Sequence, residues 1–144
     1  MSLFALVLLV GCGDAFKPIE VGKDDAILEE DVDEDPPIIV HTPITGTQNF
    51  GSDVAIEATV TDGEEGSGVL FVYLYYKNEI DGSADWNKDI LIESSEDSFT
   101  GLISGDDHSG GGIDYYLEAV DKAQNGIYSP KDGENDPHHF RIAE

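Results

Sequence analysis

Apolar and polar residues alternate in two segments of this chain, at residues 54–61 and at residues 113–120. In the first segment the alternating sets are Val54, Ile56, Ala58, Val60 and Ala55, Glu57, Thr59, Thr61. In the second they are Ile113, Tyr115, Leu117, Ala119 and Asp114, Tyr116, Glu118, Val120. A period of two is typical of a β-strand that buries one face and leaves the other exposed to water. No long stretch shows a helical period, so the pattern predicts an all-β domain.

Residues 36–144 contain seven β-rich runs separated by glycine-rich turns. The predicted strands are Ile38–Thr42, Val54–Asp62, Val69–Lys77, Lys88–Ile92, Ser98–Ile103, Ile113–Val120 and His138–Ile142. This length suffices for one compact domain and is too short for two. If the two alternating strands lie in facing sheets, they form the centre of a sandwich core. We therefore expect residues 36–144 to form a single seven-stranded β-sandwich.

An apolar run, Leu3–Val10, precedes Cys12, the only cysteine of the chain. The run is too short to span a bilayer as a helix and has the length of a secretory leader core. The tetrapeptide 9–12 resembles the lipobox of bacterial lipoproteins. That resemblance implies a signal peptide at residues 1–11, an acyl anchor on the Cys12 thiol, and a place on the exported side of the cell envelope. No lysine or arginine precedes the run, and a buried apolar strand is the alternative interpretation.

Residues 12–35 are expected to form a disordered linker between the anchor and the domain. The segment is rich in Asp and Glu and has only Lys17 and Lys23 as basic residues. Such a composition buries too little apolar surface to offset the entropy of ordering the chain. Residues 31–35 resemble the opening of a calcium loop, but the turn glycine is absent and Pro36 follows. We therefore expect a spacer with diffuse attraction for cations.

The chain carries 31 acidic and 7 basic residues, which gives a net charge of −24. Nucleic acid is excluded as a partner, because contact with phosphates needs clustered Lys and Arg. An anionic lipid surface would also repel the protein. Solubility, calcium binding and adaptation to a saline habitat are three explanations of this acidity, and the sequence does not choose among them.

Four segments in order resemble bacterial immunoglobulin-like, fibronectin type III-like modules. They are Pro36–Pro43, Val54–Asp62, Gly66–Lys77 and Asp114–Gly126. The resemblance covers the whole domain and implies a seven-stranded immunoglobulin-like sandwich. These modules recur in exported bacterial proteins, either appended to enzymes or displayed on lipoproteins. The fold hosts unrelated roles, so the resemblance does not name a ligand.

The third predicted strand carries aromatic residues on the face opposite its buried side chains. Phe71, Tyr73 and Tyr75 lie on that face, and the register expected for the sixth strand places Tyr116 beside them. Exposed rings stack on sugars or anchor a protein partner. The alternatives are cross-strand pairing that stabilises the sheet, and cover by the loop at 80–87. The four aromatic residues are the expected contact surface for a protein or carbohydrate ligand.

Acidic residues also collect in the loops of the predicted domain. Asp62 ends the second strand and Asp121 follows the sixth, so both are expected at one end of the sandwich. Calcium takes six to eight oxygen ligands, and loop carboxylates could supply some of them. Asp62 and Asp121 are therefore the candidate calcium ligands, the only cofactor that the sequence suggests. The alternative is that both side chains stabilise turns by bonding to backbone amides.

Histidine and tryptophan residues suggest no further site. His138 and His139 are adjacent on a predicted strand, so they point to opposite faces and do not chelate one zinc ion together. We expect surface or edge histidines. Trp86 is expected to pack over the end of the core. No nucleophile elbow, metal-binding helix or phosphate loop is present, so we expect no enzymatic activity.

The combined prediction is a lipid-anchored, non-enzymatic protein of the bacterial cell envelope. Its acidic linker would space an immunoglobulin-like module from the membrane, and its aromatic face would bind a partner. A calcium-stabilised structural module is the second hypothesis, and it predicts a melting temperature that rises with calcium. An accessory domain of an envelope enzyme complex is the third.

Overall fold

A computed structural model describes residues 32–79, 85–108 and 110–143. Within these ranges the chain forms ten β-strands and two single-turn 3₁₀ helices, η1 and η2. They are β1 (Ile38–His41), β2 (Thr47–Gln48), β3 (Val54–Thr61), β4 (Val69–Asn78), β5 (Asn87–Ile90), β6 (Ile92–Ser95), β7 (Ser98–Ile103), η1 (Gly105–Asp107), β8 (Gly111–Asp121), β9 (Gly126–Ser129), η2 (Gly133–Asn135) and β10 (His138–Ile142). The predicted all-β class is confirmed, and the predicted count of seven strands is wrong.

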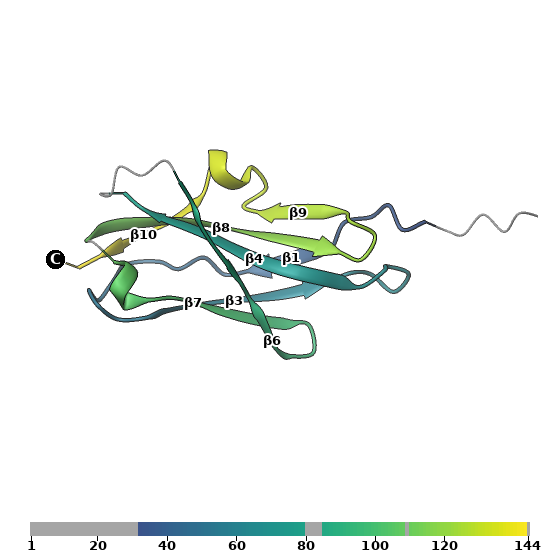
Figure 1. Cartoon of the computed structure of the whole chain (residues 1–144), viewed down its shortest axis with the longest axis horizontal. Helices are drawn as coiled ribbons and strands as arrows, with labels where there is room; N and C mark the ends of the chain where they lie inside the picture. Colours follow the sequence, from purple (N-terminus) through teal and green to yellow (C-terminus); the bar gives the residue numbers. More distant parts are fainter. Residues whose placement is uncertain (1–31, 80–84, 109, 144) are drawn as a thin grey trace, which may run out of the picture. The chain divides into compact units, whose positions relative to one another are not determined.

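The strands form two sheets (Figure 1). The four-stranded sheet has the order β1-β3-β7-β6. The six-stranded sheet has the order β2-β10-β8-β4-β5, and β9 pairs with β8 beside this path. All the pairs are antiparallel except β2 with β10.

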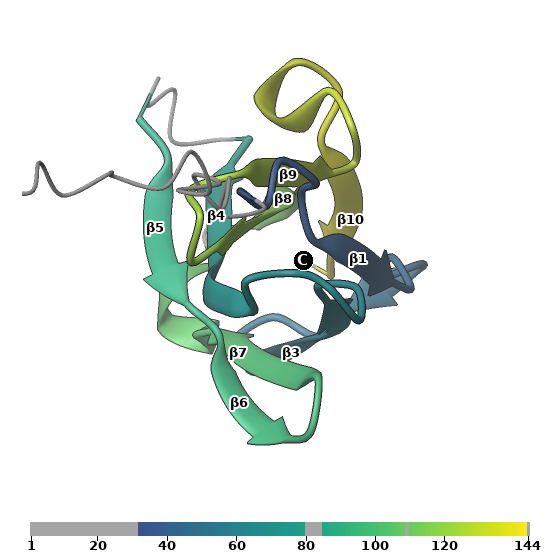
Figure 2. The same ribbon diagram turned by 90° about the vertical axis from the view of Figure 1, so that its right-hand side faces the viewer.

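The three additional strands have separate causes. The predicted strand Lys88–Ile92 divides at Leu91, where the chain leaves the six-stranded sheet as β5 and enters the four-stranded sheet as β6 (Figure 2). Leu91 is 3% exposed and its amide donates to the carbonyl of Val72, so the crossing point is packed into the core. All residues of β5 and β6 are exposed, and no alternation marks the division. β2 has only two residues, and β9 is a short strand after a turn.

β8 is the central strand of the six-stranded sheet. It pairs with β4 along most of its length, from Ile113 to Asp121. Its opposite edge pairs first with β10, over residues 111–115, and then with β9, over residues 117–120. Side chains that point outward from β8 therefore lie between β4 on one side and β9 or β10 on the other.

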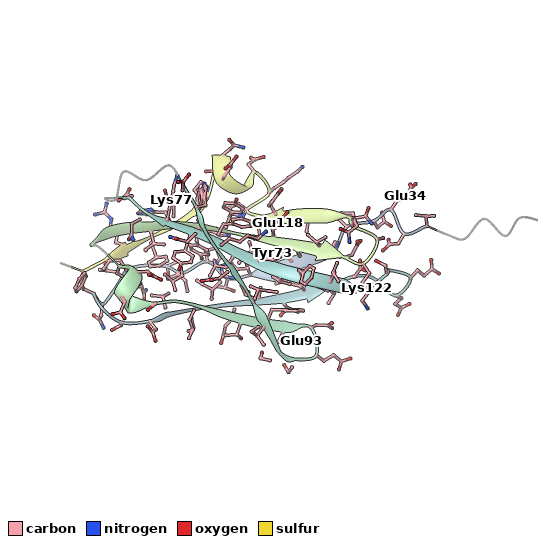
Figure 3. All side chains as sticks on the ribbon, viewed as in Figure 1. Glu34, Tyr73, Lys77, Glu93, Glu118 and Lys122 are labelled. Atoms are coloured by element: carbon pink, nitrogen blue, oxygen red, sulfur yellow. The ribbon has the colours of Figure 1, made fainter. Side chains whose placement is uncertain are left out.

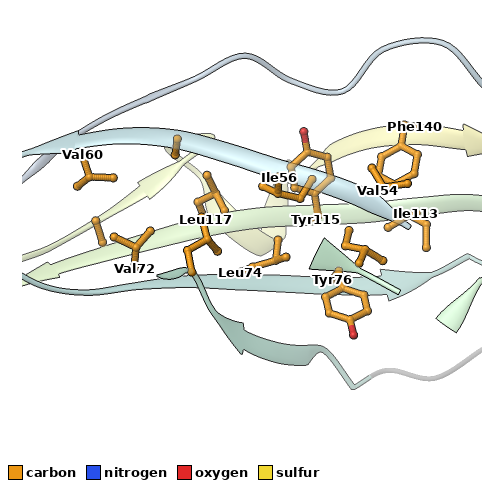
Figure 4. Close-up of a cluster of buried hydrophobic side chains, with 14 of the residues drawn as sticks. Val54, Ile56, Val60, Val72, Leu74, Tyr76, Ile113, Tyr115, Leu117 and Phe140 are labelled. Atoms are coloured by element: carbon orange, nitrogen blue, oxygen red, sulfur yellow. The ribbon is translucent and has the colours of Figure 1, made fainter. Parts of the chain in front are cut away.

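The core lies between the two sheets and follows the predicted alternation (Figure 4). The predicted inward residues of β3, β4 and β8 are all buried: Val54, Ile56, Ala58, Val60, Val72, Leu74, Tyr76, Ile113, Tyr115, Leu117 and Ala119. Burying one such large apolar side chain contributes about 1.5–3 kcal/mol of stability. The register of β4 and β8 is thereby fixed, because a slip by one residue would move each core side chain to the opposite face.

Candidate functional site

The outer face of the six-stranded sheet carries the predicted aromatic residues. Tyr73 lies opposite Glu118 and Tyr75 lies opposite Tyr116, where β4 pairs with β8. On the other side of β4, Tyr73 lies opposite Ile90 of β5. Figure 3 labels Tyr73 and Glu118 on this sheet. The structure therefore brings together all the aromatic residues that the sequence suggested.

Tyr116 is on the expected face, but it is covered rather than exposed to solvent. Its ring stacks on that of Tyr75, with centroids 4.6 Å apart and an interplanar angle of 7°. Trp86 and Tyr128 meet it edge-on, at 4.9 Å and 5.9 Å. These contacts leave Tyr116 only 7% exposed, and its burial raises the pKa of the phenol to about 12. The expectation of a solvent-facing Tyr116 is corrected: its ring supports the surface from below.

Trp86 lies on this outer face, contrary to the expectation that it packs over the end of the core. Its ring contacts Tyr116, and the Lys77 ammonium lies 4.4 Å from the centre of the indole. The expected alternative of cover by the 80–87 loop is thus partly correct, since Trp86 belongs to that loop. The sequence did not indicate which face Trp86 covers, because the side chains of the strand that follows it, β5, are all exposed and show no alternation.

The exposed part of the face consists of Phe71, Tyr73, Tyr75 and Tyr128, which we call the aromatic surface. Phe71 and Tyr128 are 40% and 44% exposed, while Tyr73 and Tyr75 are half-buried. The rings of Phe71 and Tyr73 lie 5.5 Å apart, and those of Tyr73 and Tyr75 lie 6.5 Å apart. Sequence reasoning missed Tyr128 because it did not predict β9. The sequence did contain a sign of this strand: the pair Ile127–Tyr128 comes after a turn and places one large apolar side chain on each face of the sheet.

Charged groups lie directly on the aromatic surface. The Lys88 ammonium is 3.7 Å from the ring centre of Tyr73 and 5.0 Å from that of Tyr75. The Tyr75 hydroxyl donates a 2.8 Å hydrogen bond to Glu118. Burial and this carboxylate raise the pKa of Tyr75, and the charge of Glu118 is the main cause of the raised pKa of Tyr128. The surface therefore combines π faces with a central carboxylate.

Three aspartates from different parts of the chain meet at one end of the domain. One carboxylate oxygen each of Asp33, Asp62 and Asp121 lies within 4.8 Å of the other two. Asp62 and Asp121 are the predicted pair, and Asp33 comes from the segment that was expected to be a disordered linker. We call these residues the aspartate cluster. Asp121 is fully buried, whereas the other two are half-buried.

Hydrogen bonds hold each carboxylate of the aspartate cluster in place. Asp33 accepts from the Ser67 amide at 2.7 Å, which lowers the pKa of Asp33. Asp62 accepts from the Gly68 amide at 2.5 Å. Asp121 accepts from the backbone and side-chain nitrogens of Asn125, each at 2.8 Å. The expectation that Asp62 and Asp121 stabilise turns is therefore consistent with these bonds.

Gly66 and the position of Lys122 also shape the surroundings of the aspartate cluster, since the Lys122 ammonium lies against Gly68, whose amide binds Asp62. A methyl group added at Gly66 would lie 2.3 Å from the backbone oxygen of Asp62 and 2.6 Å from its carboxyl carbon, so only glycine fits there. Among the described residues, no lysine or arginine nitrogen lies within 4.0 Å of these three carboxylates. Three converging carboxylates supply part of the oxygen set that calcium takes.

The acids in other loops of the domain do not join the aspartate cluster. Asp107 accepts a 2.9 Å hydrogen bond from the hydroxyl of Tyr76, in the loop before β8. The acids at 132–136 lie in and around η2. Neither group belongs to a set of three or more metal-binding side chains among the described residues.

The two adjacent histidines of β10 point to opposite faces, as predicted. His139 faces outward and pairs with Asp114 at 2.9 Å. His138 is half-buried, and its ring lies 5.3 Å from that of His41 and 5.1 Å from that of Tyr115. His41 is half-buried on the edge strand β1, and His139 is exposed, so both agree with the expectation of surface or edge histidines. That expectation is wrong for His108, which is 5% exposed.

The predicted leader, Cys12 and the acidic stretch up to residue 31 lie outside the described residues. Within the described part of the chain, no helix has the length and apolar composition needed to cross a membrane. Comparison with known proteins finds no family model that matches this chain and no curated protein that is significantly similar to it.

Proposed function

We propose that this chain is a lipid-anchored protein of the bacterial cell envelope that presents a non-catalytic, immunoglobulin-like contact module on the exported side. The anchor rests on the lipobox resemblance at residues 9–12 and on the acyl-accepting Cys12. The aromatic surface carries the contact function, since exposed rings on a rigid sheet are typical anchors for a partner. The partner is a protein or a carbohydrate.

The strand order supports an immunoglobulin-like sandwich. In such folds one sheet has the order A-B-E-D, and the other contains C, F and G. If β1, β3, β4, β6, β7, β8 and β10 correspond to A, B, C, D, E, F and G, the orders β1-β3-β7-β6 and β10-β8-β4 match this scheme. β9 and β10 then divide the last strand between them, and β5 is the segment that connects the two sheets.

The observation that carries the contact function is the exposure of large apolar side chains around Tyr73. Phe71, Ile90 and Tyr128 are each at least 40% exposed and lie on β4, β5 and β9, on one face of the six-stranded sheet. An exposed apolar patch on a folded domain usually marks a contact site. Tyr116, which is buried, stacks on Tyr75 from below and thereby keeps the exposed rings in fixed positions.

The test is a comparison of partner retention by the wild-type chain and by Phe71→Ser/Tyr73→Ser. Cell-envelope proteins and a panel of neutral and charged oligosaccharides serve as ligands. Phe50→Ser is the matched control, because Phe50 is 59% exposed and lies in the loop between β2 and β3, outside the aromatic surface. We expect the double variant to lose the ligand and Phe50→Ser to keep it. Equal retention by all three chains would refute the contact function.

The anchor requires its own experiment. In a bacterial host that is fed a radiolabelled fatty acid, we expect the wild-type chain to incorporate the label and to enter the membrane fraction. Cys12→Ser should do neither, because no other cysteine is present in the chain. Labelling of the Cys12→Ser chain would place the acyl group elsewhere and refute the lipobox interpretation.

The aspartate cluster favours a second candidate function, a calcium-stabilised structural module. Its specific support is Asp33, which brings a third carboxylate to the predicted pair of Asp62 and Asp121. Calcium that binds only the folded chain would raise its melting temperature. At constant ionic strength, we expect a rise with calcium in the wild-type chain and a smaller one in Asp33→Asn. Asp35→Asn, which removes an exposed carboxylate two residues away, is the control. The same rise with magnesium, or in both variants, would exclude a specific site.

A further inference from the structure

We propose that the aromatic surface binds a cationic segment of its partner, a lysine-rich stretch whose ammonium groups lie on the rings of Tyr73 and Tyr75. The inference rests on the proposed contact function and names the chemistry of the partner. It is argued from the lysine ammonium groups of the protein itself, which already lie over aromatic rings of this face.

Two lysines of the domain lie over aromatic rings of this face. Lys88 is 3.7 Å from the centre of the Tyr73 ring, and Lys77 is 4.4 Å from that of Trp86. An ammonium group within about 6 Å of a ring centre is attracted by the negative face of the π system. The described residues contain only five basic side chains, namely Lys77, Lys88, Lys122, Lys131 and Arg141. Two of the five therefore occupy this one face, which shows where an ammonium group is stabilised on this protein.

Carboxylates increase the attraction for a cation. Glu118 lies between Tyr73 on β4 and Tyr128 on β9 and accepts a hydrogen bond from the Tyr75 hydroxyl. The negative charge of Glu134 also reaches this face, since it contributes to the raised pKa of both Tyr116 and Tyr128. Glu118 and Glu134 thus place two negative charges on the face that carries Lys88 and Lys77.

The charge of the whole chain selects the same class of partner. A net charge of −24 repels anionic partners and steers cationic ones toward the protein. The surface then determines where the cation stays, since rings and carboxylates converge there. The long-range attraction and the short-range contacts thus both favour a cationic partner.

A neutral sugar is a poorer fit for the same rings. To stack on the covered face of Tyr73 it would displace Lys88 and lose the cation–π attraction. An incoming ammonium group that replaces Lys88 restores that attraction on the same ring. Lys88 is exposed and lies on the edge strand β5, so it is free to move aside without disturbing the core.

The test is a titration of the full chain with decalysine at fixed ionic strength, followed by the NMR signals of the aromatic rings. Lys88→Met uncovers the Tyr73 ring, whereas Lys122→Met removes the same charge from an exposed position away from the rings. We expect Lys88→Met to bind about two- to fivefold more tightly than Lys122→Met. Tyr73→Leu keeps the apolar area but removes the π face, and it should bind about two- to fivefold more weakly than wild type.

Two results would overturn the inference. Ring signals that do not shift on saturation, or equal affinities for the two lysine variants, would mean that decalysine senses only the overall charge. Saturable ring shifts with a neutral hexasaccharide but not with decalysine would replace the cationic partner by a sugar, and would leave the proposed contact function standing. That function fails separately, if Phe71→Ser/Tyr73→Ser retains its partner as the wild type does.

Discussion

His41 on β1 and Tyr115 on β8 join the two sheets through a hydrogen bond of 2.8 Å between Nε2 and the hydroxyl. The Nδ1 of His41 is 2.7 Å from the carbonyl oxygen of Glu57, which only accepts, so Nδ1 carries the proton. Nε2 therefore accepts from the Tyr115 hydroxyl, and that oxygen in turn accepts from the Ile44 amide at 2.9 Å. One buried phenol thus connects β1, the segment that follows it, and the centre of the opposite sheet.

Replacing Tyr115 with phenylalanine should destabilise the domain by about 1–3 kcal/mol, because two polar partners remain without a hydrogen bond in a part-buried site. Chemical denaturation monitored by fluorescence measures the change in the free energy of unfolding. Tyr128→Phe is the control, since its side chain is 44% exposed and its partner Glu118 still accepts a hydrogen bond from Tyr75. Equal loss in both variants, or none in either, would show that the contact between His41 and Tyr115 contributes nothing specific.

The stability of the domain should fall as the pH drops through about 6.5, because two histidines are held neutral in the folded chain. Burial lowers the pKa of His41 below 6.5. Burial also lowers the pKa of His138, as does the nearby charge of His41, while Asp136 acts in the opposite direction. The Nε2 atom of His138 is buried without a hydrogen-bond partner, so a proton there gains no acceptor. The unfolded chain then binds more protons, and the stability is complete only above the unfolded pKa.

Denaturation curves between about pH 5.5 and 7.5 measure this dependence, and His138→Phe isolates it. Phenylalanine keeps an aromatic ring against His41 and Tyr115 but does not titrate. We expect the slope of stability against pH to become smaller in this variant. An unchanged slope would assign the pH dependence to other groups.

The sequence was sufficient to predict the buried residues of a strand that buries one face and exposes the other. In β3 the alternation of Val54 and Ile56 with Ala55 and Glu57 is a local property, because the strand itself separates apolar from polar side chains. The same holds for the inner face of β8. The division at Leu91 had no such signal, because the flanking residues of β5 and β6 are exposed on both faces.

The candidate sites depended on contacts that no local pattern encodes. Tyr116 was placed on the correct face, yet Trp86 and Tyr128, from separate segments, bury it. Asp33 was one of many acids in a polar segment. Only Ser67 and Asn125, which bind it from distant loops, distinguish it from its neighbours. Such pairings arise from the topology of the folded chain, and a single sequence does not reveal them.

Adjacent residues of β7 test the register of the four-stranded sheet. Ile103 is fully buried and Leu102 is 55% exposed, although both are large aliphatic residues. Ile103→Ala should reduce the free energy of unfolding by about 2–5 kcal/mol, because it removes core contacts and leaves a cavity. Leu102→Ala should change it by no more than about 0.5 kcal/mol. Thermal unfolding of the two variants measures the contrast, and similar losses would mean that β7 is misregistered.

The Tyr116→Ser variant distinguishes two possible roles of Tyr116, namely support of the aromatic surface from below and direct contact with a partner. Tyr116 is 7% exposed and stacks on Tyr75, so its truncation should reduce the free energy of unfolding by about 3–5 kcal/mol. Tyr73→Ser, on the half-exposed part of the same face, should cost clearly less, about 1 kcal/mol. Denaturant midpoints of the two variants provide the comparison. A Tyr116→Ser variant as stable as Tyr73→Ser would mean that the Tyr75–Tyr116 stack does not hold the surface in place, and Tyr116 would again be a candidate for direct contact.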